Sequence, residues 1–115
     1  MKVHGLFLNA QRKVTFPPGG VVFNEGDAGK EMFGIIRGGI QLEVAGRPIA
    51  TLGADDVFGE MAIVDGSPRM ATATATEETE LAVIDRNRFL FLVQETPMFA
   101  LSVMSAMAGR LRNQG

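Results

Sequence analysis

The sequence contains no cysteine, no tryptophan and no tyrosine, and its single histidine is His4. Without cysteine the chain has neither a disulfide framework nor a thiol site. One histidine is too few for a metal site, or for a metal-dependent β-barrel enzyme that gathers several histidine ligands. A net charge of −2 is unlike the concentrated basic surface that broad nucleic-acid binding needs. We therefore expect no metal, no cofactor and no direct DNA binding by this chain.

Long hydrophobic runs are also absent. No apolar run approaches the roughly 18 residues that a membrane helix needs, and residues 1–10 lack the extended apolar segment of a signal peptide. These features predict a cytoplasmic protein that does not contact a membrane. The 115 residues, of which 46% are hydrophobic and 21% charged, suit one globular domain over residues 1–115.

Turn residues recur at short, even intervals in the first half of the chain. The run 40–44 alternates apolar and polar side chains, and Ala and Thr alternate over 71–76. Period-two alternation is typical of half-buried strands, and frequent turns favour an all-β roll or barrel over parallel β-α units. We expect the β-roll to cover about residues 14–84.

The pattern becomes helical after residue 84. Asp85 is suited to be an N-cap, helical spacing continues over 86–95, and Pro97 interrupts it. A second helix over about 98–111 has a broad apolar surface. We expect C-terminal helices over about 85–113, with this surface available to a homodimer partner or to an effector protein.

The most informative stretch is Phe58-Gly59-Glu60-Met61-Ala62-Ile63, followed by Pro68-Arg69-Met70-Ala71-Thr72. Arg69 offers a planar fork of donors that suits two phosphate oxygens. Glu60 offers a carboxylate that can accept a hydrogen bond from a ribose hydroxyl. Gly59 and Ala62 have little or no side chain, so backbone N–H groups there can approach an anion closely.

This ordered string resembles the phosphate-binding cassette of cyclic nucleotide-binding domains, and the glycine turns extend the resemblance to roughly residues 14–112. The family includes catabolite-activator-type bacterial regulators and the regulatory subunits of cyclic-AMP-dependent kinase. The resemblance implies a mainly β fold, a jelly-roll-like double-stranded β-helix, with a short cassette helix at 61–64 and two C-terminal helices. The N-terminus of this cassette helix would favour an anion.

The resemblance also implies roles. Arg69 would hold the exocyclic oxygens of a cyclic phosphate, Glu60 would accept from the ribose 2′-hydroxyl, and backbone N–H groups would add donors. The ligand-binding residues are then Gly59, Glu60, Met61, Ala62, Arg69, Met70 and Ala71. Binding would move the last helix about a hinge at 85–97. Nothing here resembles a nucleophile–base pair, so we expect a sensor and not an enzyme.

Met70 departs from the family pattern, which has a small residue after the arginine. Methionine has no strong donor or acceptor. Because position 70 is not a threonine, the resemblance favours cyclic AMP as the ligand, with cyclic GMP as the second candidate. Three other interpretations stay open. Arg69 could be a surface charge paired with Glu60, the chain could be an interaction module that lost its ligand, or it could be a short form or fragment of a catabolite-activator-type transcription regulator.

Overall fold

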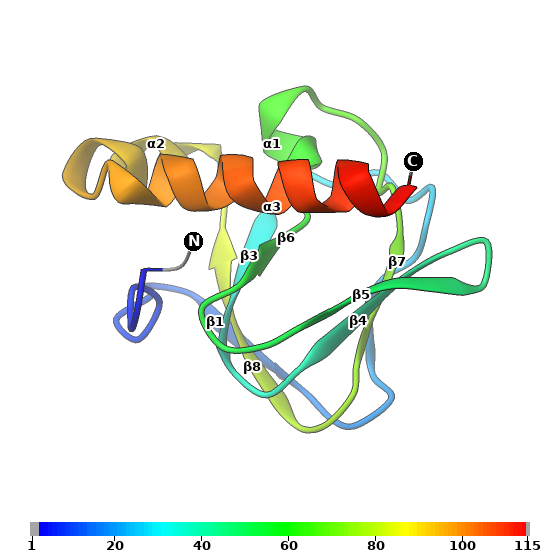
Figure 1. Ribbon diagram of the computed structural model, residues 1–115. Helices are drawn as coiled ribbons and strands as arrows, with labels where there is room; N and C mark the ends of the chain where they lie inside the picture. Colours follow the sequence, from blue (N-terminus) through cyan, green and yellow to red (C-terminus); the bar gives the residue numbers. More distant parts are fainter. Residues whose placement is uncertain (1–2, 115) are drawn as a thin grey trace.

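The protein folds as two facing antiparallel sheets, and the helices gather at one end of this pair of sheets (Figure 1). The structure, a computed structural model, describes residues 3–114. The strand order is β1-β8-β3-β6 in one sheet and β2-β7-β4-β5 in the other. In chain order the elements are β1 (Lys13–Phe16), β2 (Val21–Phe23), β3 (Met32–Arg37), β4 (Ile40–Val44), β5 (Arg47–Leu52), β6 (Val57–Phe58), α1 (Met61–Val64), β7 (Thr72–Ala75), β8 (Thr79–Ile84), α2 (Arg86–Glu95) and α3 (Met98–Gln114).

β7 lies inside its sheet, between β2 and β4, and the alternation of Ala and Thr gives its two faces different burial. Ala73 and Ala75 are buried, whereas Thr72 and Thr74 are half-buried. Small side chains on the inner face let β7 pack closely against the opposite sheet. The predicted fold class, a mainly β roll with a short cassette helix and two C-terminal helices, is confirmed.

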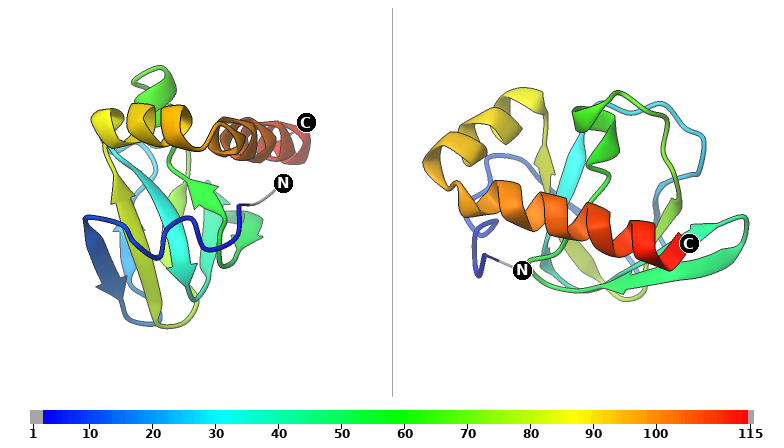
Figure 2. Two further views of the ribbon diagram at one scale, coloured as in Figure 1. Left: turned by 90° about the vertical axis from the view of Figure 1, so that its left-hand side faces the viewer. Right: turned by 45° about the horizontal axis from the view of Figure 1, so that its top comes forward.

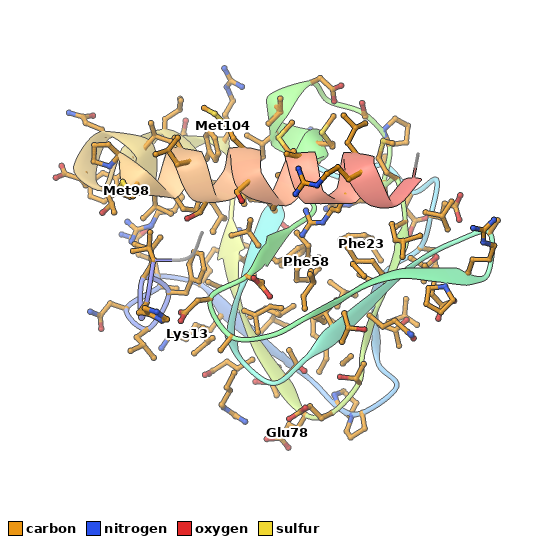
Figure 3. The ribbon with its side chains drawn as sticks, viewed as in Figure 1. Lys13, Phe23, Phe58, Glu78, Met98 and Met104 are labelled. Carbon is orange, nitrogen blue, oxygen red and sulfur yellow. The ribbon has the colours of Figure 1, made fainter. Side chains whose placement is uncertain are left out.

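The core between the sheets is aromatic near the helices. The rings of Phe33 and Phe58 are stacked with centroids 5.4 Å apart, and Phe23 lies 5.9 Å from Phe58. Phe23 and Phe58 lie below α3 in the space between the sheets (Figure 3). Stacked rings of this kind bury a large apolar area and give β6 and the start of α1 a rigid base.

A second core joins the helices to the sheet β1-β8-β3-β6. Phe99 of α3 packs edge-on against Phe89 of α2 and against Phe7, which precedes β1. Phe7 is buried above Gly34, where a Cβ atom would overlap its ring.

The two C-terminal helices begin and end where the sequence predicts. The side chain of Asp85 accepts a hydrogen bond from Arg88 N at 2.8 Å, which is an N-cap. The helices are bent by 119° at the break around Pro97, so α3 lies across the roll and contacts β5 and β6 (Figure 2). No single helix among residues 3–114 has both the length and the apolar character to cross a membrane, although α2 and α3 counted together would pass by length and composition alone.

Candidate functional site

A cavity of about 260 Å³ lies between α1, the loop after α1 and α3. Leu42 and Ile49 of the sheet β2-β7-β4-β5 also line it. All the residues that the sequence predicts as ligand-binding line this one cavity; these are Gly59, Glu60, Met61, Ala62, Arg69, Met70 and Ala71.

Two glycines delimit α1. Gly59 has φ +77° and Gly66 has φ +71°, the left-handed region that favours glycine. Between them, the backbone oxygen of Glu60 accepts hydrogen bonds from Ile63 N and Val64 N, both at 3.0 Å. The chain therefore leaves β6, forms one short helix and reverses. This geometry presents Met61 and Ala62 to the cavity.

The loop after α1 is held by a local carboxylate. Asp65 accepts hydrogen bonds from the hydroxyl and from the backbone N–H of Ser67. These two bonds, the hydroxyl first, lower the pKa of Asp65, because they favour the charged form. The carboxylate of Asp65 thus bridges two positions of this loop, which leads directly into Arg69.

Arg69 is buried, with 8% of its surface exposed. Its Nη1 donates to the backbone oxygens of Glu31 at 2.7 Å and Gly59 at 3.2 Å. Its guanidinium lies 4.2 Å from the centroid of the Phe23 ring. Gly29 borders the opposite side, where a Cβ atom would overlap the guanidinium. Arg69 is therefore held by an aromatic face, two carbonyl groups and a glycine.

The donors of Arg69 are incompletely used. Within the described part of the chain, Nε is buried without a hydrogen-bond partner, and no carboxylate forms a salt bridge with this guanidinium. Burial lowers the pKa of Arg69, while the charges of Glu31, Asp27 and Glu60 act in the opposite direction. An arginine nevertheless remains charged in proteins. A buried cation with an unpaired donor is suited to receive an anion.

Glu60 is the second buried charge of the site, with 5% of its surface exposed. Its carboxylate forms a salt bridge with Nη1 of Arg110 in α3, and Nη2 of Arg110 donates to the backbone oxygen of Val57. Arg110 therefore connects α3 to the start of α1 and to β6. The interpretation that Arg69 is a surface charge paired with Glu60 is wrong, because Arg69 is buried and Glu60 pairs with Arg110.

Sequence reasoning missed Gly29, Phe23 and Arg110 as parts of the site. A signal for Arg110 was present, because it lies three residues after Met107 and one before Leu111, on the apolar side of its helix. A charge on an apolar helix face requires a partner. Phe23 lies in a strand and Gly29 in a loop, and the sequence pattern of both segments is equally consistent with a purely structural role.

Comparison with known proteins agrees with this geometry. A family model described as the cyclic nucleotide-binding domain matches residues 13–96. The cyclic AMP receptor protein of Thermus thermophilus is 35% identical over 112 residues, which are 93% of this chain and 52% of that protein. The chain belongs to the cyclic nucleotide-binding domain family.

Two further relatives show the range of proteins that contain this domain. The crystal structure of the Thermus thermophilus catabolite activator protein superposes with a TM-score of 0.75 at 31% identity, over 90% of this chain and 51% of that one. A cyclic nucleotide-gated potassium channel of Rhizobium etli is 33% identical over 96 residues, which are 84% of this chain and 27% of the channel. The chain thus spans about half or less of the length of these relatives.

Proposed function

We propose that this chain is a cytoplasmic sensor module that binds a cyclic nucleotide, with cyclic AMP as its ligand, and that it has no catalytic activity of its own. The observation that carries the proposal is the buried guanidinium of Arg69, which lines the cavity without a carboxylate partner among residues 3–114. The similarity to a protein named cyclic AMP receptor protein supports the choice of ligand.

The charges around the cavity favour a cyclic phosphate over an open one. Among the described residues that line the cavity, Arg69 and Arg110 are positive and Glu60 is negative, so this lining carries one net positive charge. A cyclic phosphodiester carries one negative charge and balances it. A terminal phosphate carries about −1.5 to −2 at neutral pH and leaves excess negative charge in a partly buried site. We therefore expect 5′-AMP to bind more weakly than cyclic AMP.

Glu60 has the capacity for a second partner. A carboxylate has about four acceptor positions, so a ribose 2′-hydroxyl can donate to Glu60 beside Arg110. Such a ligand also changes the bond between Glu60 and Arg110, which ties α3 to α1. A ligand that binds more tightly with α3 in one of two positions raises the population of that position. We propose that this shift, about the break at Pro97, is the output of the module.

The exposed face of α3 offers a surface for that output. Leu101, Met104, Ala108 and Leu111 follow each other at intervals of three, four and three residues and are exposed, and the last two also border the cavity. This is the spacing of a coiled-coil seam. We propose that a second copy of the chain covers this seam, and an effector protein is the alternative occupant.

Isothermal titration calorimetry of the full chain tests the proposed ligand. We expect cyclic AMP to bind, and Arg69→Ala to weaken binding by about 1.5–3 kcal/mol, the range for a hydrogen bond to a charged group. This corresponds to roughly 10- to 150-fold in Kd. Arg37→Ala is the matched control, because the Arg37 side chain is 55% exposed and pairs with Glu78 and Glu80 away from the cavity.

Two results would contradict the proposal. Equal affinities of the wild type and Arg69→Ala would remove the assigned role of the guanidinium. If no cyclic nucleotide binds the wild type, the alternative of an interaction module that retains the fold without the ligand takes its place.

A further inference from the structure

The cavity has two chemically different ends. Arg69, Glu60 and Arg110 form the charged end. Among the cavity-lining residues in the described part of the chain, these three supply every charged or hydrogen-bonding side chain. The other end is formed by aliphatic and methionine side chains from three parts of the fold, namely Leu42, Ile49, Met70, Met107 and Leu111.

The described side chains at this apolar end lack hydrogen-bonding groups that could read the edge of a base. Sites that reject near-identical ligands by large factors do so with hydrogen-bonding groups that a wrong ligand leaves unpaired. The side chains at this end of the cavity offer only van der Waals contact, and a methionine sulfur is at most a weak acceptor. Methionine is also unbranched and flexible, so Met70 and Met107 can adapt to rings of different shape.

The apolar end is also open to water. Met70, which lies outside the proposed seam on α3, is 50% exposed. The polar edge of a base can therefore keep hydrogen bonds to solvent while its faces contact the methionines. A base with more polar groups then avoids the cost of about 1–3 kcal/mol that each buried, unsatisfied group would incur. The site neither rewards nor penalises a particular edge.

We infer that this site accepts cyclic nucleotides irrespective of their base and takes its selectivity from the cyclic phosphate and the ribose. The inference rests on the proposed function and defines its ligand class as nucleoside 3′,5′-cyclic monophosphates in general. Cyclic AMP is then one member of a set of ligands of similar affinity. Purines bind slightly more tightly than pyrimidines because they cover more of the apolar wall.

Calorimetric titration of the full wild-type chain with five ligands tests this inference. The ligands are the 3′,5′-cyclic monophosphates of adenosine, guanosine and cytidine, together with 2′-deoxy cyclic AMP and 5′-AMP. We expect the three cyclic ligands that carry a 2′-hydroxyl to lie within about tenfold of one another in Kd, or 1.4 kcal/mol. The last two should each bind more than about tenfold more weakly than cyclic AMP. The 2′-deoxy ligand loses the hydroxyl that donates to Glu60, and the terminal phosphate of 5′-AMP brings negative charge that the site does not balance.

The possible results separate this inference from the proposal beneath it. A preference for one base of more than about 30-fold, or 2 kcal/mol, would overturn the inference and leave the proposed function intact. Failure of every cyclic nucleotide to bind would overturn both.

An engineered variant adds an independent test. Met107→Gln places an amide at the apolar end, and we expect it to widen the spread among the three bases beyond about tenfold, because an amide can pair with some base edges and not others. Met98→Gln is the control, since Met98 lies on the same helix, is 47% exposed and does not line the cavity. An equal spread in both variants and the wild type would argue against contact between Met107 and the base.

Discussion

Removal of Arg110 should destabilise the fold more than any other change of an arginine on α3. In Arg110→Met the side chain stays unbranched and keeps its tendency to form helix, but Glu60 loses its counter-ion. The two side chains of this pair are 14% and 6% exposed, so water replaces the lost partner poorly. Breaking a buried ion pair in this way costs about 3–5 kcal/mol. We expect about 3 kcal/mol, because Arg110 retains some contact with solvent.

A double-mutant cycle separates the ion pair from the other contacts of Arg110. In Glu60→Gln/Arg110→Met neither charge remains, so the penalty of an unpaired buried charge disappears. The carbonyl of Val57 still loses the donor that Arg110 provides, which costs about 1 kcal/mol. We therefore expect the double variant to be at least about 2 kcal/mol more stable than the sum of the single effects predicts.

Urea unfolding followed by far-ultraviolet circular dichroism is the suitable assay, because the chain has no tryptophan or tyrosine to report unfolding by fluorescence. Arg112→Met is the control, since Arg112 lies two residues further along α3 and is exposed. Such surface substitutions usually change the free energy of unfolding by no more than about 0.5 kcal/mol. A loss below about 1 kcal/mol in Arg110→Met, together with additive single effects, would refute the reasoning that this pair is buried and coupled.

Three further changes test other parts of the structure. Gly29→Ala should displace the guanidinium of Arg69 and weaken cyclic AMP binding by about tenfold with little change in melting temperature; unchanged affinity in a titration would show that Gly29 does not position Arg69. Phe7→Ala should cost about 3 kcal/mol in urea unfolding, because Phe7 is 3% exposed and packs on Phe99; a loss near zero would mean that Phe7 is not part of the core. Met104→Glu should abolish self-association in sedimentation velocity, because it places like charges opposite each other in the proposed seam; an unchanged dimer would place the contact elsewhere.

Much of the local structure follows from short-range properties of the sequence. Asp85 and Pro97 mark the ends of α2 because a side-chain cap and a missing N–H act within a few residues. Gly59 and Gly66 likewise delimit α1, since their backbone angles suit glycine and disfavour other residues. The alternation over β7 indicates which side of the strand is buried. The order of residues from Phe58 to Thr72 was sufficient to predict the family and seven of the residues that line the cavity.

The tertiary structure decided which charges meet. Arg110 and Glu60 are fifty positions apart, and no periodicity within either segment relates them. Their contact depends on the bend between α2 and α3, which brings α3 over the cavity. The same applies to Arg69, whose Nη1 donates to the carbonyl of Glu31, thirty-eight positions away in the sequence. Local pattern determined the elements because it acts over a few residues, whereas the pairing of buried charges depends on how the packed elements cross, which only the assembled core determines.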